Sequence, residues 1–331
     1  MSELMNRVNG ALGDRYDDMN GLQFGLLVVT LAALVAAPVW GGAYLRVFAL
    51  ANIFAIFAMG WDIQSGYTGY ISFGHAVLSG AAAYTSALIL THVAPDISVW
   101  AIFPIAVLMS VIVGLLLAVP TLRLRGPYFS LITLVAGLLF YRGTRTASQY
   151  TGGEQGLLVG RITFDPVLRF YLTLIPMLLI AAALLYLSRS NIGTILIAIR
   201  ENEAAVESAG IDTTKFKIWS FVLSSIPMGI GGFLFAHFDG TVNPTDVVLI
   251  DRSVEMIAMA VMGGMGSILG PIAGAFLFVG LRDGVLPAFL SGTERWLALW
   301  IVVLLVIVFA RDGLFRKIWH RLGDYGGGDT E

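Results

Sequence analysis

Apolar stretches long enough to cross a membrane recur along almost the whole chain, separated by short polar segments. A helix needs about 20 predominantly apolar residues to cross a hydrocarbon core of about 30 Å. Windows of roughly this length predict helical spans at 22–40, 45–61, 71–90, 99–119, 128–141, 168–187, 218–237 and 296–310. The first span lacks the basic region and short apolar core of a secretory signal, so we expect it to be a retained helix.

A further apolar stretch, residues 253–286, is too long for one span. Its middle contains Gly263, Gly264, Gly266 and Pro271, which favour a broken helix or a tight hairpin within the membrane. Counted as two passes, this stretch brings the total to about ten. The predicted fold class is therefore all-α, a polytopic membrane helix bundle of about ten transmembrane helices with a broken or hairpin segment.

Composition agrees with a membrane protein and excludes several other classes. The chain is 57% hydrophobic and only 13% charged, with a net charge of −2, so neither an ordinary soluble domain nor a nucleic-acid-binding protein is indicated. Its mean hydropathy is +0.82. The absence of cysteine excludes disulfides, thiolate metal sites and thiol nucleophiles.

Basic residues predict the orientation. They cluster in the polar loop at about 188–217 and in the tail at 311–331, which favours a cytoplasmic location for both. Two segments on the same side of a membrane must be separated by an even number of passes. The loop and the tail meet this condition when the broken stretch is counted as two passes. We therefore expect a cytoplasmic segment 1–21, a transmembrane domain 22–310 and a cytoplasmic tail 311–331. The loop 142–169 is predicted outside despite its four arginines, which this topology does not explain.

Two sets of residues are candidates for lining a pathway. Ser72 and His75 lie in or beside an apolar stretch, where a polar side chain needs a partner. Either His75 is tied to a neighbouring carbonyl in a packed crossing, or it lines a path for a solute. Glu255 lies near the start of the broken stretch, where it is either solvated at the interface or buried to bind an ammonium group or relay protons. Gly263, Gly264 and Gly266 are candidates from the same stretch, although glycine series more often serve helix packing.

The central polar loop predicts a short helix. Its residues are strong helix formers up to Ala209, and Gly210 suits the position just after a helix C-terminus. Such a helix is either a simple connector or an element that docks on a soluble partner.

Motifs for enzymatic chemistry are missing. The chain has no phosphate-binding G-x-x-x-x-G-K-[ST] loop and no hydrolase, metalloprotease or kinase signature, so it does not itself use ATP in the usual way. Its four histidines are scattered. We therefore predict neither an enzyme nor a metal site nor a cofactor.

Five blocks, taken in order, resemble the LivM-like permeases of branched-chain amino acid ABC importers, which belong to a wider family for hydrophobic amino acids, amides and urea. They are G-Y-T-G-Y-I-S-F-G-H at 66–75, L-R-L-R-G-P-Y at 122–128, T-G-G-E-Q-G at 151–156, R-E-N-E to G-I at 200–211, and G-G-M-G-S-I-L-G-P-I-A-G at 263–274. Each block is modest alone, but five in order are specific.

The resemblance implies an alternating-access permease subunit of a bacterial or archaeal inner membrane, which forms the pathway for branched-chain or related amino acids. It implies as partners a homologous second permease, two cytoplasmic ATPase subunits that hydrolyse ATP, and an extracytoplasmic binding protein, besides membrane lipid. Glu203, Ala204, Ala205 and Gly210 would form the segment that meets an ATPase. Four residues separate Ala205 from Gly210, where the general importer pattern has three, so the register of this helix is left open.

Alternative functions stay open from the sequence alone. Permeases for urea or short amides share the family. A stand-alone proton-coupled transporter would use His75 and Glu255 as a relay, and a non-transporting scaffold would only recruit partners.

Overall fold

The computed structural model describes residues 21–121, 127–310 and 313–319. The predicted cytoplasmic segment 1–21 and tail 311–331 lie largely outside these residues. Arg123 and Arg125, with most of the second motif block, also lie outside them.

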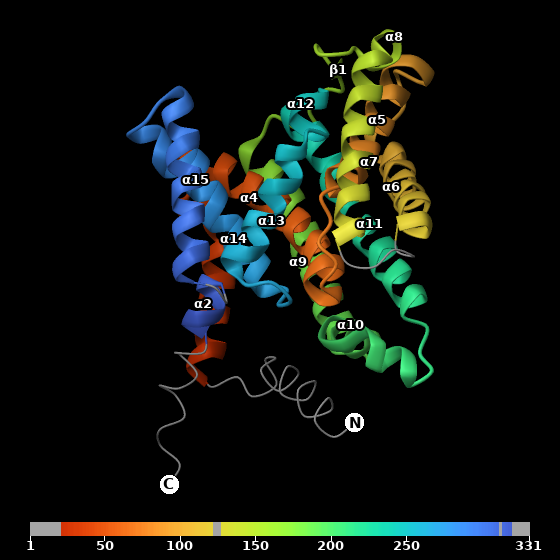
Figure 1. Cartoon of the computed structure of the whole chain (residues 1–331). Coiled ribbons are helices and arrows are strands. Elements are labelled where there is room, and N and C mark those ends of the chain that lie inside the picture. The colour runs from red at the N-terminus through yellow and green to blue at the C-terminus, as the bar shows by residue number, and fades with distance from the viewer. Residues whose placement is uncertain (1–20, 122–126, 311–312, 320–331) are drawn as a thin grey trace.

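The chain forms a bundle of helices that run between two ends (Figure 1). The elements of its first half are α2 (Gly21–Val35), α3 (Ala37–Trp40), η1 (Gly42–Tyr44), α4 (Leu45–Trp61), η2 (Asp62–Gly66), α5 (His75–Leu88), η3 (Ile89–Val93), α6 (Val99–Thr121), α7 (Pro127–Thr146), α8 (Ser148–Thr151) and β1 (Leu157–Leu158). Those of the second half are α9 (Pro166–Ser188), α10 (Asn191–Ser208), α11 (Thr213–Asp239), β2 (Thr241–Val242), α12 (Pro244–Val247), α13 (Ile250–Gly263), α14 (Leu269–Val279), η4 (Gly280–Val285), η5 (Leu286–Ala288) and α15 (Gly292–Phe309).

The predicted polytopic helical bundle is confirmed. Within the described part of the chain, 7 helices are long and apolar enough to cross a membrane. The predicted segments at 22–40 and 128–141, and the first half of 253–286, fall on α2, α7 and α13, which are not among these helices. A count of ten spans therefore stays a prediction.

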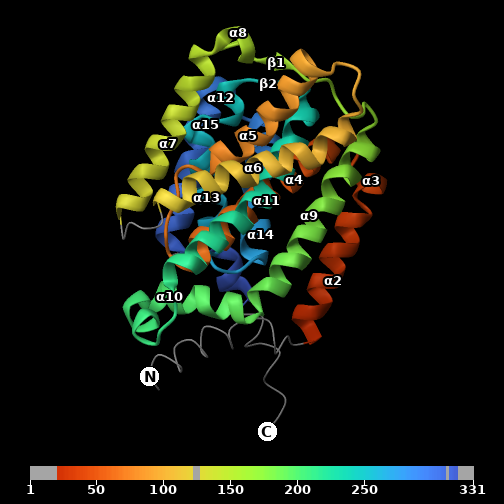
Figure 2. The ribbon, with the colours of Figure 1, turned by 90° about the vertical axis from the view of Figure 1, so that its right-hand side faces the viewer.

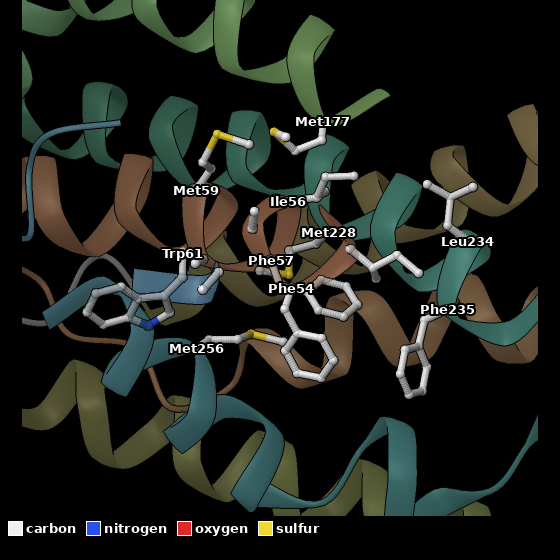
Figure 3. Close-up of a cluster of buried hydrophobic side chains, with 14 of the residues drawn as sticks. Phe54, Ile56, Phe57, Met59, Trp61, Met177, Met228, Leu234, Phe235 and Met256 are labelled. Atoms are coloured by element: carbon white, nitrogen blue, oxygen red, sulfur yellow. The ribbon is translucent and has the colours of Figure 1, made fainter. Parts of the chain in front are cut away.

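Helix α4 is the centre of the bundle. It is apolar on all sides and packs against α9, α11, α13 and α14, as expected for a helix with no polar face. Phe54 contacts Phe57 and Phe235 edge to face, with ring centroids 5.9 and 6.1 Å apart. Methionines from α9, α11 and α13 fill the space around this aromatic cluster (Figure 3).

The outer helices expose apolar side chains. Leu115 and Leu116 on α6, and Leu304 and Phe309 on α15, are among the exposed large hydrophobic residues. Exposed apolar surface of this extent is typical of a protein that is solvated by lipid.

The two ends of the bundle differ (Figures 1 and 2). One end carries α8, α12 and a two-stranded antiparallel sheet in which Leu157 pairs with Val242. His237 joins this end to the bundle, since its ring bonds the Gly160 carbonyl at 3.1 Å and the Ser86 hydroxyl at 2.8 Å. Helix α10 lies across the other end.

The predicted break in the long apolar stretch is confirmed. Helices α13 and α14 form a hairpin that turns between Gly264 and Ile268. A Cβ on Gly263 would overlap the Gly270 carbonyl, and one on Gly274 would overlap the Met259 carbonyl. The glycines therefore allow close backbone approach.

One predicted span begins later than its apolar window. The window at 71–90 corresponds to α5, which starts only at His75. Residues 69–74 are not helical, and Gly69 has a φ of +76°. A non-helical connection therefore joins α4 to α5 inside the apolar sequence.

We expect Gly274→Ala to lower the stability of the purified protein by about 1–3 kcal/mol, because the new methyl group has no space between α13 and α14. Gly280→Ala is the matched control, since a Cβ added at Gly280 would meet no other atom within 4 Å. Thermal unfolding in detergent measures both. Equal melting temperatures would contradict the close approach.

Candidate functional site

Helix α10 is divided into two arms at Asn202. This residue has φ −161° and ψ 92°, an extended conformation within an otherwise helical element. Its side-chain oxygen accepts a hydrogen bond from the Ala205 N–H at 3.0 Å, as an N-cap does. Residues 203–208, called the distal arm below, therefore form a short helix of their own.

The distal arm ends two residues before Gly210, the position that the sequence predicts to follow a helix C-terminus. Gly210 has a φ of +85°, which favours glycine, and the Ile211 N–H bonds back to the Val206 carbonyl at 3.3 Å. Ala204 and Gly210 are exposed and Ala205 is partly exposed. Three of the four predicted coupling residues therefore lie at the surface.

Glu203, the fourth, points into the protein. Its carboxylate pairs with the Lys217 ammonium at 2.6 Å and accepts hydrogen bonds from the Tyr70 hydroxyl and, at 3.0 Å, from the Thr213 hydroxyl. The Lys217 side chain is only 2% exposed, and its nitrogen lies 4.5 Å from the centre of the Tyr70 ring. This cluster ties the distal arm to α11 and to the α4–α5 connection.

The cluster favours the ionised form of Glu203. Burial alone would raise the pKa of its carboxyl group, but the hydrogen bonds from Lys217, Tyr70 and Thr213, with the charge of Lys217, outweigh burial and lower that pKa below its ordinary value. Glu203 is therefore a carboxylate at neutral pH.

Arg200, on the other side of Asn202, holds the same connection. Its guanidinium donates a hydrogen bond to the Gly66 carbonyl at 2.7 Å. A Cβ on Gly69 would be 3.2 Å from the Arg200 side chain, so the turn packs closely against the arginine stem.

The two glycine-rich motif blocks meet at this place. The Gly266 N–H donates to the Asp62 carboxylate at 2.8 Å, and a Cβ on Gly66 would be 2.8 Å from the Gly266 nitrogen. Gly264 and Gly266 have φ values of +116° and +76°, which form the turn between α13 and α14. Both breaks in the bundle are therefore joined to each other close to α10.

Ser72 shapes the α4–α5 connection. Its carbonyl accepts a hydrogen bond from the Trp61 indole at 2.8 Å, its N–H donates to Ser65 at 3.2 Å, and its hydroxyl accepts from the Gly74 N–H at 3.3 Å. The side chain is fully buried. Ser72 therefore fixes the backbone that leads into α5.

His75 is the first residue of α5 and is fully buried. Its Nε2 lies 3.2 Å from the Ser224 hydroxyl, whereas its Nδ1 has no hydrogen-bond partner among the described residues. The next backbone N–H, of Ala76, donates to the Ser253 hydroxyl of α13 at 3.1 Å. The start of α5 is thus joined to α11 and α13.

Glu255 belongs to a buried ion-pair cluster. Its oxygens lie 2.6 Å from the Arg252 guanidinium and 3.4 Å from that of Arg282, which also pairs with Asp283 at 2.8 Å. Both arginines stack over Phe54, at 4.9 and 4.6 Å from its ring centre. Glu255 is buried rather than solvated, and its charge is balanced within the chain.

A cavity of about 590 Å³ lies beside this cluster, between α13 and α15. It is lined by Asp251, Val254, Glu255, Trp296 and Trp300. In the described residues, no hydrogen bond or ion pair joins Glu255 to His75. The two candidate pathway residues therefore belong to separate clusters.

The described residues contain no group of three or more His, Asp or Glu side chains that could hold a metal ion. The geometry is instead that of helices broken at glycines and joined, through buried ion pairs and hydrogen bonds, to a helix at one end.

Comparison with known proteins identifies the family to which the chain belongs. Residues 43–309 match the family described as branched-chain amino acid transport system permease component. The chain belongs to this permease family. The resemblance inferred from the motif blocks is thereby confirmed.

Several relatives of this permease cover most of its length. The high-affinity branched-chain amino acid transport system permease protein LivM of Salmonella typhimurium is 30% identical over 287 residues, which are 76% of this chain and 67% of LivM. A probable LivH permease of Methanocaldococcus jannaschii is 24% identical over 275 residues, 78% of this chain and 86% of its own. The fructose import permease protein FrcC of Rhizobium meliloti is 25% identical over 321 residues, 88% and 85% of the two chains. No solved structure matches the permease significantly.

Several residues of these clusters were not among the sequence-based candidates. They are Asp62, Tyr70, Arg200, Lys217, Arg252 and Arg282. Charges at the edges of apolar windows were the available signal, since Asp62 follows one window directly and Lys217 precedes another. Arg252 lies only three residues before its partner Glu255, and Arg282 lies next to Asp283. The remaining partners lie 14 or more positions away in the sequence and could not be read from local patterns.

We expect Glu255→Gln to destabilise the permease by about 3 kcal/mol, because the buried Arg282 and the partly buried Arg252 would lose a shared counter-ion. Asp251→Asn on the same helix is the control, since Asp251 is exposed. Melting temperatures in detergent compare the two variants. A Glu255→Gln protein as stable as the control would show that the ion pairs contribute little.

Proposed function

We propose that this permease is the subunit of an ABC importer that forms the translocation pathway for branched-chain or related amino acids. The observation that carries the proposal is the distal arm, which presents an exposed surface at one end of the bundle while Glu203 and Arg200 fasten α10 to the broken α4–α5 connection. The relatives named as branched-chain amino acid permeases support this choice of substrate.

The energy source in this proposal is ATP hydrolysis by two separate cytoplasmic ATPase subunits. They dock on the exposed side of the distal arm, which includes Ala204 and Ser208, and on Gly210 beyond it. This permease supplies the path and is not the enzyme, and no cofactor is required.

The remaining partners follow from the relatives. LivM and LivH are both named as permeases of branched-chain amino acid transport systems, which supports a homologous second permease beside this chain. An extracytoplasmic binding protein would deliver the amino acid.

The orientation follows from the docking surface. The end that carries α10 faces the cytoplasm, and the end that carries α8, α12 and the small sheet faces outward (Figure 1). Both chain termini then lie in the cytoplasm.

Transport proceeds by alternating access. A displacement of the distal arm moves the connection that holds Ser72 and His75, and the turn formed by Gly263, Gly264 and Gly266 moves with it because Asp62 links the two breaks. In this mechanism these residues shape the path. Glu255 stabilises the helices beside the path through its ion pairs with Arg252 and Arg282.

We expect Ala204→Arg to abolish ATP-dependent uptake and the co-purification of ATPase subunits, because a large charged side chain would project from the docking surface. Membrane insertion should be unchanged, since Ala204 is exposed. Gln149→Arg, at an exposed position of α8 at the other end, is the matched control and should transport normally.

Three results would contradict the proposal. They are normal uptake by Ala204→Arg, uptake by the purified chain alone in a proton gradient, and the import of urea, short amides or sugars in place of amino acids.

A further inference from the structure

The two arms of α10 hold opposite ends of one short turn. Arg200, before the bend at Asn202, bonds the Gly66 carbonyl at 2.7 Å. Glu203, after the bend, bonds the Tyr70 hydroxyl. A change in the angle at Asn202 must therefore strain the turn 66–70 or move one of its ends.

This turn is stiff. The Thr68 hydroxyl donates to the Gln64 carbonyl at 2.6 Å, and the Gly69 N–H donates to the Ser65 carbonyl at 3.0 Å. The preceding residues Asp62–Gly66 form a π-helical turn, a feature found often at functional sites. A displacement of Tyr70 is therefore passed along the chain to the segment that starts α5.

Lys217 is the third residue of the contact between Glu203 and Tyr70. Burying an ammonium group is costly unless it is paired, and the Lys217 nitrogen has both the Glu203 carboxylate at 2.6 Å and the Tyr70 hydroxyl at 3.2 Å. It also faces the Tyr70 ring. Because Lys217 lies in α11, it fixes the meeting point of Glu203 and Tyr70 relative to a long helix of the bundle.

We propose that Lys217 is a positioning residue for transport, which keeps Glu203 on Tyr70 so that rotation of the distal arm about Asn202 moves the turn 66–70 and the start of α5. Glu203 then transmits force inside the permease, and the ATPase contacts the other face of the arm. This inference rests on the proposed function, because it requires an ATPase that moves the arm.

Lys217→Met tests the inference, with Lys215→Met as its matched control. Lys215 lies two residues away on the same helix, is exposed, and contributes its backbone N–H to the helix cap formed by Asp212. The full complex of permeases, ATPases and binding protein is reconstituted in proteoliposomes, and leucine uptake and ATP hydrolysis are measured together. The amount transported per ATP hydrolysed should fall about tenfold in Lys217→Met, within the range of typical coupling energies, and stay unchanged in Lys215→Met.

Tyr70→Phe is the second variant, because it removes only a hydroxyl group and keeps the ring. It should also lower the amount transported per ATP, and it decides the question where Lys217→Met fails to assemble.

A merely structural role would reduce hydrolysis and uptake in proportion and leave their ratio constant, which would overturn the inference. A ratio equal to that of Lys215→Met in both variants would overturn it too. A wild-type complex that assembles but imports no amino acid would overturn the proposed function instead.

Discussion

Backbone groups that are freed where a helix breaks inside a lipid-embedded protein have no water to bond, so the protein must supply their partners. This permease has two such breaks, at 69–74 and at 264–268, and it brings the segments beside them together. The Asp62 carboxylate accepts a hydrogen bond from the Gly266 N–H, and the Arg200 guanidinium donates one to the Gly66 carbonyl. Arg200 comes from α10 and Asp62 from η2, which follows α4 directly. The same bonds that satisfy the backbone therefore also connect α10 to the interior of the bundle.

That constraint explains why the motif blocks are rich in glycine. A Cβ on Gly66 would lie 2.8 Å from the Gly266 backbone nitrogen, and one on Gly266 would lie 2.7 Å from the Arg200 guanidinium. Gly69 leaves room for the Arg200 stem, which a Cβ there would approach to 3.2 Å. The glycines therefore serve approach and turning. The chemistry of the site comes from the charged and hydroxyl groups beside them, above all Glu203, Lys217 and Tyr70.

The sequence predicted what local patterns encode. The apolar windows identified the helices of the bundle, the Gly263–Pro271 region predicted the hairpin, and Gly210 predicted the end of the distal arm. The first residue of a helix was harder to predict. The apolar residue Ile71 made the predicted window begin four residues before α5, which starts at His75. The bend at Asn202 was missed because good helix formers surround it.

Pairings across the fold could not be predicted from one sequence. The resemblance predicts that Glu203 belongs to the segment that meets an ATPase, but its inward contact with Lys217 depends on how α10 and α11 meet. For Glu255 the sequence leaves open a solvated position at the interface or a buried functional role. Its pairing with Arg282, 27 residues away, depends on the α13–α14 hairpin. Apolar windows show which residues form the helices of the bundle but not which side chains meet between them.

Cytoplasmic ATPases can move the distal arm only if the arm lies in the cytoplasm. Because the chain has no cysteine, Ser208→Cys and Gln149→Cys can each be labelled alone with a membrane-impermeant thiol reagent. The account predicts that Ser208→Cys reacts only in inside-out vesicles, with protection by bound ATPase subunits, and that Gln149→Cys reacts only in right-side-out vesicles. Labelling of Ser208→Cys from the outside would contradict it.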